Sequence, residues 1–358
     1  MIFDKTLIYN YHSQKTIMGL MYVGIFTSFI ILIVLNMTFL ILNGYLWLSD
    51  GIQSLGLDQS FIENIYYSLY LKWIILVNVS WILLTLIFML KRKHYKTNSD
   101  LHYLRNLPVI DPKICVVIPT YNEEKNIGNM IHECFNQKFV EKIIVVDNNS
   151  SDKTTDIAEK EKNVIVIKKK INKGHTHSCV MGLKESLKTD TNIVALIDAD
   201  GTFSPNDLNK LIPYLDNCDL VIGSRQHQVI TEKGNQNSMF YVWGNLFLAK
   251  LLQLKYFSLL HLGVVQLTDV GCTYRCIKKE SLKKIMHELT NPSNPAILKP
   301  ENWLFSIYMT MLAIENDLKI VEIPITFGKR HGISKSNVDV KSKGIIYGLK
   351  FLWFILYR

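Results

Sequence analysis

Two long apolar stretches near the N-terminus dominate the hydrophobic pattern of the chain. Ile17–Leu42 carries no charged residue, and as a helix it would extend about 39 Å, more than the roughly 30 Å of bilayer hydrocarbon. Trp73–Leu90 is also uncharged and would extend about 27 Å as a helix. Uncharged core helices of this length are uncommon, so the pattern predicts two transmembrane helices, at about 17–43 and 66–90. They would form a membrane anchor over residues 1–96.

The charges that flank these stretches predict the orientation of the anchor. Basic residues precede the first stretch (Lys5 and Lys15) and follow the second (Lys91, Arg92, Lys93 and Lys96). The loop between the two stretches contains Asp50, Asp58 and Glu63 and no basic residue before Lys72. The positive-inside rule then places the N-terminus and everything after Leu90 in the cytoplasm. We expect an integral membrane protein of the plasma membrane in a prokaryote, or of the endoplasmic reticulum in a eukaryote. A cleaved signal peptide is disfavoured, because the first stretch is too long and no small-residue cleavage site ends it.

Beyond a polar linker at 97–111, apolar runs of strand length alternate with helix-like stretches. The runs are Ile114–Ile118, Ile143–Val146, Val164–Ile167, Ile193–Ile197 and Leu220–Ile222, and the stretches are Glu124–Asn136, Lys153–Glu161, Gly174–Leu187 and Asn206–Leu215. Near-continuous apolar strands separated by helices predict a mostly parallel α/β sheet with helices on both faces. In such sheets, ligands bind beyond the carboxyl ends of the strands.

Two apolar segments lie outside this alternation. Met239–Leu254 is rich in aromatic residues and lacks a clean polar face, so it either lies on the membrane surface or packs on the sheet. The apolar tail Ile345–Tyr357 would extend only about 20 Å as a helix, too short to cross a bilayer. We therefore expect an interfacial amphipathic helix within residues 336–358.

Net charge and cysteine usage narrow the class of protein. Much of the net charge of +9 lies in the cluster after the second apolar stretch and in the C-terminal lysines, which suits anionic lipid headgroups. No nucleic-acid-binding module is recognisable, so no nucleic-acid partner is expected. All six cysteines follow the second stretch, on the cytoplasmic side, where we expect reduced thiols. The spacings of Cys272, Cys276, His175 and His177 do not match those of structural zinc sites.

Polar residues follow each predicted strand, where chemistry is expected. The five segments are Pro119-Thr120-Tyr121-Asn122-Glu123, Asp147-Asn148-Asn149-Ser150-Ser151-Asp152, Asn172-Lys173-Gly174-His175, Asp198-Ala199-Asp200-Gly201 and Gly223-Ser224-Arg225. The two carboxylates of Asp198 and Asp200 suit a divalent cation held against a diphosphate, and oxygen ligands favour Mg²⁺ or Mn²⁺. The helix that opens at Gly174 presents N–H groups that favour an anion.

With these five motifs in order, the chain resembles glycosyltransferase family 2, the inverting nucleotide-sugar enzymes of GT-A fold, within residues 112–335. Later motifs resemble the polyprenyl-phosphate, dolichol-phosphate-mannose-synthase-like branch: Gly223-Ser224-Arg225, Thr268-Asp269, Val321-Glu322-Ile323-Pro324-Ile325 and Arg330-His331-Gly332-Ile333-Ser334-Lys335. The chain departs from that branch at Gly271-Cys272-Thr273-Tyr274, which replaces the more usual Ser-Gly-Phe after the aspartate. Many relatives also carry their membrane spans after the domain.

The resemblance implies roles for individual residues. Pro119, Tyr121, Glu123 and Asp147 would bind the base and ribose of a UDP- or GDP-sugar, with Lys173 nearby. Asp198 and Asp200, which flank Ala199, would hold Mg²⁺ or Mn²⁺ on the donor diphosphate. Arg225, Arg330, Ser334 and Lys335 would face phosphates of donor and acceptor, since arginine stays charged and binds phosphate bidentately. Asp269 is the candidate base or acceptor-orienting carboxylate, and Glu301 is the second candidate.

The expected activity is that of a membrane-bound, metal-dependent, inverting hexosyltransferase. It would move a sugar from a nucleotide sugar to polyprenyl (dolichyl or undecaprenyl) phosphate at the cytoplasmic face. Three alternatives stay open: transfer to a hydroxyl of a glycolipid or lipid-linked glycan, a processive polysaccharide synthase, and a catalytically silent module that binds nucleotide sugar. The missing Gln-x-x-Arg-Trp signature disfavours the processive synthase. The sequence does not decide between a monomer and a homo-oligomer.

Overall fold

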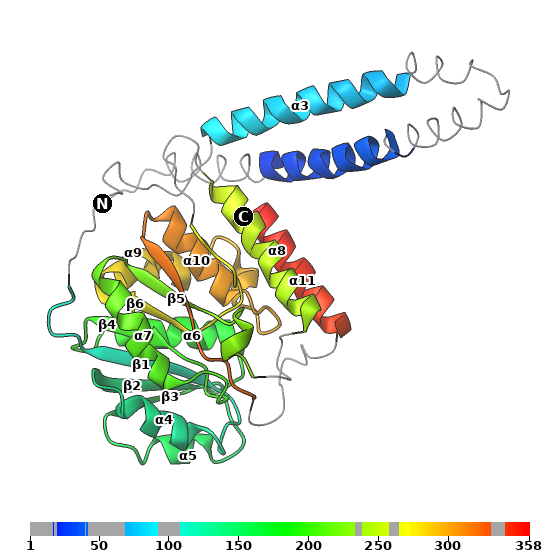
Figure 1. Ribbon diagram of the computed structural model, residues 1–358. Helices are drawn as coiled ribbons and strands as arrows, with labels where there is room; N and C mark the ends of the chain where they lie inside the picture. The colour runs from blue at the N-terminus through cyan, green and yellow to red at the C-terminus, as the bar shows by residue number, and fades with distance from the viewer. Residues whose placement is uncertain are drawn as a thin grey trace, which may run out of the picture. The chain divides into compact units, whose positions relative to one another are not determined.

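The computed structural model describes residues 17, 20–39, 41, 69–91, 108–232, 238–257, 265–330 and 341–358 (Figure 1). The chain divides into two compact units. One comprises Met1–Arg92 together with Trp353–Arg358, and the other comprises Lys93–Leu352. Most of the linker predicted at 97–111 lies outside the described residues, so the predicted domain boundaries stay predictions.

Two apolar helices make up the described N-terminal part of the first unit. The helix Leu20–Phe39 and helix α3 (Leu69–Lys91) run antiparallel, because Tyr22 stacks on Phe88 and Phe29 lies against Trp81, each pair with ring centroids 5.4 Å apart. Among the described residues, Leu20–Phe39 is the one helix long and apolar enough to cross a membrane, and the apolar stretch Lys72–Phe88 is shorter. The prediction of two transmembrane helices is therefore not confirmed.

Seven strands form one sheet in the second unit, in the order β3-β2-β1-β4-β6-β5-β7. They are β1 Ile114–Thr120, β2 Val140–Asp147, β3 Val164–Lys168, β4 Ile193–Leu196, β5 Leu220–Ser224, β6 Arg275–Lys278 and β7 Ile320–Pro324. All neighbours pair in parallel except β6, which is antiparallel to both β4 and β5. The five predicted strands and the mostly parallel α/β sheet are confirmed. Every residue of β1 is buried, as expected of a central strand covered on both faces.

The hydrophobic pattern does not predict β6 as a strand. Its first residue, Arg275, is almost fully buried, although a charged side chain is normally costly to bury. Its guanidinium donates to the carbonyls of Ser306 (2.9 Å) and Cys272 (2.6 Å), and burial lowers its pKa to about 10. Tertiary partners therefore make this residue compatible with the sheet, and they are not visible in a local pattern.

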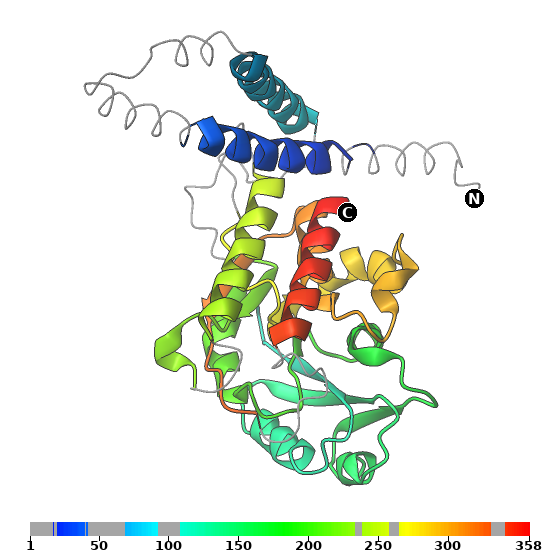
Figure 2. The ribbon, with the colours of Figure 1, turned by 90° about the vertical axis from the view of Figure 1, so that its right-hand side faces the viewer.

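Helices cover the sheet on both faces (Figures 1 and 2). They are α4 Ile127–Phe135, α5 Thr154–Ala158, α6 Gly174–Ser186, α7 Leu208–Leu211, α9 Lys279–Thr290 and α10 Phe305–Glu315. The helix predicted at Asn206–Leu215 is broken into 3₁₀ turns on either side of α7, Pro205–Asp207 and Ile212–Asp216. A proline lies in the first turn of each, at positions 205 and 213, where the missing N–H favours a new helical start.

Helices α8 (Met239–Tyr256) and α11 (Lys341–Tyr357) lie side by side in both views (Figures 1 and 2). They approach closely, since a Cβ atom added at Gly344 would lie 2.7 Å from the ring of Tyr241. The C-terminal half of α8 is mostly buried, whereas Trp243 and Phe247 in its first half are exposed. The buried half agrees with the interpretation that this segment packs on the domain, whereas its position at a membrane surface stays a prediction.

All six cysteines are buried and form no disulfide. Burial raises the pKa of each thiol, to about 12 for Cys115 and Cys218. Thiolates are the reactive form of cysteine, so these side chains are chemically quiet. The expectation of reduced thiols agrees with this arrangement.

Candidate active site

A cavity of about 1080 Å³ lies where the parallel strands end, at the edge of the sheet predicted to bind ligands. Most predicted site residues line it together: Pro119, Tyr121, Glu123, Asp198, Ala199, Asp200, Arg225, Glu301 and Arg330. Asp147, Lys173 and Asp269 do not line it, and Ser334 and Lys335 lie outside the described residues. The fold therefore brings together side chains that lie up to about 200 positions apart in the sequence.

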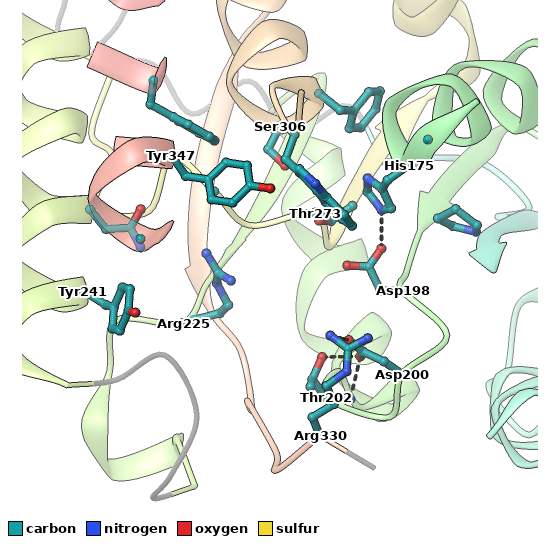
Figure 3. Close-up of a pocket in the computed structure, with 18 of the residues that line it drawn as sticks. His175, Asp198, Asp200, Thr202, Arg225, Tyr241, Thr273, Ser306, Arg330 and Tyr347 are labelled. Carbon is teal, nitrogen blue, oxygen red and sulfur yellow. Dashed lines mark hydrogen bonds and ion pairs between the residues drawn. The ribbon is translucent and has the colours of Figure 1, made fainter. Parts of the chain in front are cut away.

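Asp198 and Asp200 follow β4 and point into the cavity from its polar side (Figure 3). His175 Nε2 donates to Asp198 Oδ1 at 2.9 Å. Asp200 Oδ1 accepts hydrogen bonds from Thr202 N (3.1 Å) and Oγ1 (2.6 Å), and its Oδ2 lies 3.1 Å from Arg330 Nη1. Each carboxylate is thus held in one orientation by neighbouring donors.

The two carboxylates respond differently to burial. Burial raises the pKa of both, but for Asp198 the charge and hydrogen bond of His175 outweigh it, with smaller effects of Thr273 and Arg330, so its pKa is lowered. For Asp200, burial and the like charge of Asp198 outweigh Arg330 and Thr202, so its pKa is raised. Two carboxylates that repel each other across a cavity favour a cation between them.

This pair fits a divalent cation shared with a substrate. Among the described residues, no group of three or more His, Cys, Asp and Glu side chains forms a complete protein-only site. Mg²⁺ is commonly held by one or two carboxylates plus substrate phosphates, which is what Asp198 and Asp200 can provide. A diphosphate bound in the same cavity would supply the remaining ligands.

Arg225 enters the cavity from the end of β5 (Figure 3). Asp269, which does not line the cavity, pairs with the Arg225 guanidinium. Its Nε donates to Asp269 Oδ2 at 2.7 Å and its Nη2 donates to Oδ1 at 2.8 Å, a bidentate ion pair. The side chain of Asp269 is 0% exposed, against 14% for Arg225. Because Arg225 also lines the cavity, its guanidinium can contact a ligand there.

The position of Asp269 argues against its predicted role as a base. Burial raises its pKa, but Arg225 and the Gly271 N–H outweigh burial, so the pKa lies below the usual value. Glu322 accepts hydrogen bonds from the backbone N–H groups of Thr268 (2.6 Å) and Asp269 (2.9 Å), which fixes the loop. A fully buried carboxylate that already accepts from arginine is a poor proton acceptor for a substrate. In the structure, Asp269 pairs with Arg225 and does not line the cavity.

At the other end of the cavity, Asn148 lies in a network at the ends of β2 and β3. Its Oδ1 accepts from Lys169 Nζ (2.8 Å) and Lys173 N (3.0 Å), and its Nδ2 donates to Asn172 Oδ1 (2.7 Å). Burial lowers the pKa of Lys169 to about 8. Asn148 and Asn172 both line the cavity, beside Tyr121. This end offers amide groups and an aromatic ring, as a nucleoside would require.

Asp147 shapes this end without lining it. It accepts hydrogen bonds from the N–H and hydroxyl of Ser150, and Ser150 Oγ in turn accepts from Asn122 N at 2.8 Å. The loops after β1 and β2 are thereby joined. Lys173 contributes its backbone N–H, and its side chain does not line the cavity.

The opposite wall of the cavity is mainly apolar and comes from α8 and α11. It consists of Phe240, Tyr241, Gly244, Asn245, Phe247 and Leu248 on α8, and of Gly344, Ile345, Tyr347, Gly348, Leu349, Phe351 and Leu352 on α11. A Cβ atom added at Gly244 or Gly348 would meet nothing within 4 Å, so the wall is open at both glycines. One cavity therefore has a charged side and an apolar side.

Several lining residues were not predicted as site residues, notably His175, Thr273, Trp303 and Ser306. His175 lies in the first turn of α6, Thr273 precedes β6, Trp303 precedes α10, and Ser306 lies in the first turn of α10. The clue in the sequence is weak: His175 follows the predicted anion-binding turn, and Trp303 lies beside the candidate Glu301. Their proximity to Asp198 depends on tertiary packing.

Sequence comparisons agree with this architecture. The sequence model described as Glycosyl transferase family 2 matches residues 115–286. The chain is 30% identical to polyprenol monophosphomannose synthase of Mycolicibacterium smegmatis, over 62% of this chain and 79% of that protein. It is 29% identical to UDP-N-acetylglucosamine–dolichyl-phosphate N-acetylglucosaminyltransferase of Methanococcus voltae, over 60% and 85% of the two chains. It is 25% identical to undecaprenyl-phosphate mannosyltransferase of Micrococcus luteus, over 67% and 96%.

Proposed function

We propose that this chain, which belongs to glycosyl transferase family 2, transfers a hexosyl group from a nucleotide sugar to polyprenyl phosphate. The relatives named above support the reaction type, because their names specify polyprenyl, dolichyl or undecaprenyl phosphate as the acceptor. Their names differ in the sugar, so this choice stays open for the present chain.

The observation that carries the proposal is the two-sided cavity. Its charged side contains Asp198, Asp200 and Arg225, whereas its other side is the apolar wall of α8 and α11. A water-soluble donor needs only the first side. An isoprenoid phosphate needs both, because its phosphate requires cations and its chain requires apolar surface.

The donor would lie along the strand ends. Asn148, Asn172 and Tyr121 are suited to the nucleoside, and the Asp198–Asp200 pair is suited to the diphosphate. A bound Mg²⁺ or Mn²⁺ would neutralise charge on the departing nucleoside diphosphate. Arg330, which lies 3.1 Å from Asp200 and 3.6 Å from Glu123, is placed to contact the same phosphates.

The acceptor phosphate would meet Arg225. An acceptor phosphate oxygen attacks the anomeric carbon, the bond from that carbon to the nucleoside diphosphate breaks, and the configuration inverts. No proton has to be removed, because the phosphate is already anionic. Catalysis then depends on positioning and on charge stabilisation, consistent with a buried Asp269 that orients Arg225.

The membrane arrangement is part of the proposal. The antiparallel contacts between Leu20–Phe39 and α3 are consistent with a hairpin of two membrane spans. Ile346 on α11 is exposed and does not line the cavity, which is consistent with an interfacial helix. The flanking lysines and arginines favour a cytoplasmic domain.

The test is transfer by membranes that contain the full chain. They are incubated with a panel of labelled UDP- and GDP-sugars, with added polyprenyl phosphate and Mn²⁺ or Mg²⁺. We expect one labelled lipid that releases its sugar in mild acid, as a glycosyl phosphate does. An acid-stable labelled lipid would point to a hydroxyl acceptor, and no labelled lipid with any donor would point to a silent module. Either result contradicts the proposal.

Asp200→Asn tests the metal assignment within the same assay. It should abolish transfer at every Mn²⁺ concentration, because it removes one of the two anionic ligands. Asp190→Asn, at an exposed carboxylate that does not line the cavity, is the matched control and should leave transfer unchanged. Near-normal metal-dependent transfer by Asp200→Asn would refute the assignment.

A further inference from the structure

The segment Pro300–Trp303 packs closely on the first turn of α6. Gly174, which opens α6 with φ +83°, has no room for a side chain, because a Cβ atom there would lie 2.5 Å from Pro300 Cα. Thr176 Oγ1 donates to the Asn302 carbonyl at 2.9 Å. From the other side, Lys350 Nζ of α11 donates to the Glu301 carbonyl and to Asn302 Oδ1, both at 3.3 Å. Contacts from two helices therefore fix this segment.

The same segment leads directly to the acidic pair. The ring of Trp303 stacks on the imidazole of His175, with centroids 5.1 Å apart and planes 19° from parallel. His175 Nε2 donates to Asp198 Oδ1 at 2.9 Å. Figure 3 shows His175 directed at Asp198, with the hydrogen bond drawn between them. Trp303, His175 and Asp198 thus form a continuous row along the cavity.

We propose that Trp303 and His175 are positioning residues for Asp198, which hold its carboxylate in the orientation that binds the metal–diphosphate group of the donor. The stack on Trp303 fixes the plane of the imidazole, and the imidazole fixes Asp198 through Oδ1. This inference rests on the proposed function, since it assigns Asp198 to the donor site.

The physical reason is preorganisation of a metal ligand. An aspartate with no partner samples several rotamers, and a metal must then select one of them. Hydrogen-bonded partners that orient ligands typically contribute 10–100-fold to metal affinity. Asp200 has its partners in Thr202 and Arg330, whereas the main partner of Asp198 is His175 at 2.9 Å, with smaller effects of Thr273 and Arg330. His175 should therefore act specifically through Asp198.

Three substitutions separate the stack from the hydrogen bond. His175→Phe keeps a ring against Trp303 but removes the donor to Asp198. His175→Gln keeps a donor but removes the ring, and Trp303→Leu removes the stack from the other side. His177→Phe is the matched control on the same helix turn, because His177 does not line the cavity.

The readout is Mn²⁺ binding by the purified full chain in detergent. Free Mn²⁺ is measured by electron paramagnetic resonance, with UDP and separately with GDP present. We expect His175→Phe to weaken Mn²⁺ binding about 10–100-fold, with smaller losses for His175→Gln and Trp303→Leu and none for His177→Phe. Raising Mn²⁺ should restore the maximal transfer rate of His175→Phe, which a folding defect would not permit.

The result that overturns the proposal is Mn²⁺ affinity within twofold of wild type for both His175→Phe and Trp303→Leu. If His175→Phe does not fold, His175→Gln and Trp303→Leu carry the same comparison. The assay contains no lipid, so its outcome is separate from that of the proposed reaction. A wild-type chain that binds Mn²⁺ and nucleotide but transfers nothing to polyprenyl phosphate refutes the proposed function and leaves the positioning test valid. A wild-type chain that binds no Mn²⁺ with either nucleotide refutes both.

Discussion

Asp269→Asn is the substitution that most directly separates an anchoring carboxylate from a catalytic base. Asp269 accepts two hydrogen bonds from the Arg225 guanidinium and others from the N–H groups of Arg225 (3.2 Å) and Gly271 (3.0 Å). An asparagine retains one acceptor oxygen and turns an NH₂ group toward these donors. The substitution therefore leaves a nearly buried arginine without its counter-charge.

The magnitude follows from this geometry. Breaking a buried ion pair by removing one partner costs about 3–5 kcal/mol. For a unit the size of Lys93–Leu352, each kcal/mol lowers the melting temperature by about 2–4 °C. We therefore expect Asp269→Asn to lower the melting temperature by about 6–20 °C, as well as to impair transfer through a misplaced Arg225.

The assay is thermal unfolding of the full chain in detergent, monitored by tryptophan fluorescence. It compares Asp269→Asn, Arg225→Met and the double variant that carries both substitutions. Arg225→Met/Asp269→Asn should melt above Asp269→Asn alone, because it removes the uncompensated charge. Asp190→Asn is the control for a lost surface carboxylate. A melting temperature for Asp269→Asn within about 2 °C of wild type, combined with abolished turnover, would refute the anchoring argument and restore Asp269 as the base.

Three further predictions address other parts of the site. The Arg225–Asp269 pair should stabilise the protein at all pH values above the ordinary aspartate pKa and lose this effect as pH falls through the lowered pKa of folded Asp269. The melting-temperature difference between wild type and Asp269→Asn should therefore shrink only below about pH 4. A difference that shrinks near neutral pH contradicts this prediction. Lys169→Met should raise the KM for the donor about tenfold or more with little change in kcat, because Asn148 loses a charged hydrogen-bond donor. Unchanged nucleotide binding in a direct titration would exclude a role of Lys169 in donor binding. Gly348→Leu should raise the KM for long-chain polyprenyl phosphates more than for short-chain analogues, because it fills the open wall of the cavity at α11. Ile346→Leu is the control, since Ile346 does not line the cavity. Equal effects on both acceptors would argue against an isoprenoid lying along α11.

The site residues at the ends of the parallel strands could be predicted from the sequence. Polar residues directly after apolar runs identify the ends of β1, β2, β4 and β5, and parallel strands bring their ends to one edge of the sheet. This reasoning places Tyr121, Asp198, Asp200 and Arg225 in one cavity, as observed. It depends only on local patterns and on a general property of parallel sheets.

The positions of Asp269, Trp303 and His175 depend on long-range packing that no local sequence pattern encodes. Asp269 follows a threonine in a polar motif, and nothing in the residue type distinguishes a buried anchor from an exposed base. The segment that leads into β6 brings Asp269 to the end of β5, where it pairs with Arg225. The stack of Trp303 on His175 likewise joins residues far apart in the sequence. Exposure and long-range contact are the quantities that the sequence alone does not supply.

The six buried thiols make this chain convenient for mapping its membrane topology by chemical labelling. Because burial keeps the native cysteines protonated and sheltered, a maleimide reagent should leave the unaltered protein unmodified. One cysteine introduced at Asp58, in the loop between the two apolar stretches, would then be the sole reporter, without removal of any native residue. Reaction of that reporter with an impermeant reagent on intact cells, and protection of a second reporter placed at Asp190, would reveal on which side of the bilayer each segment resides.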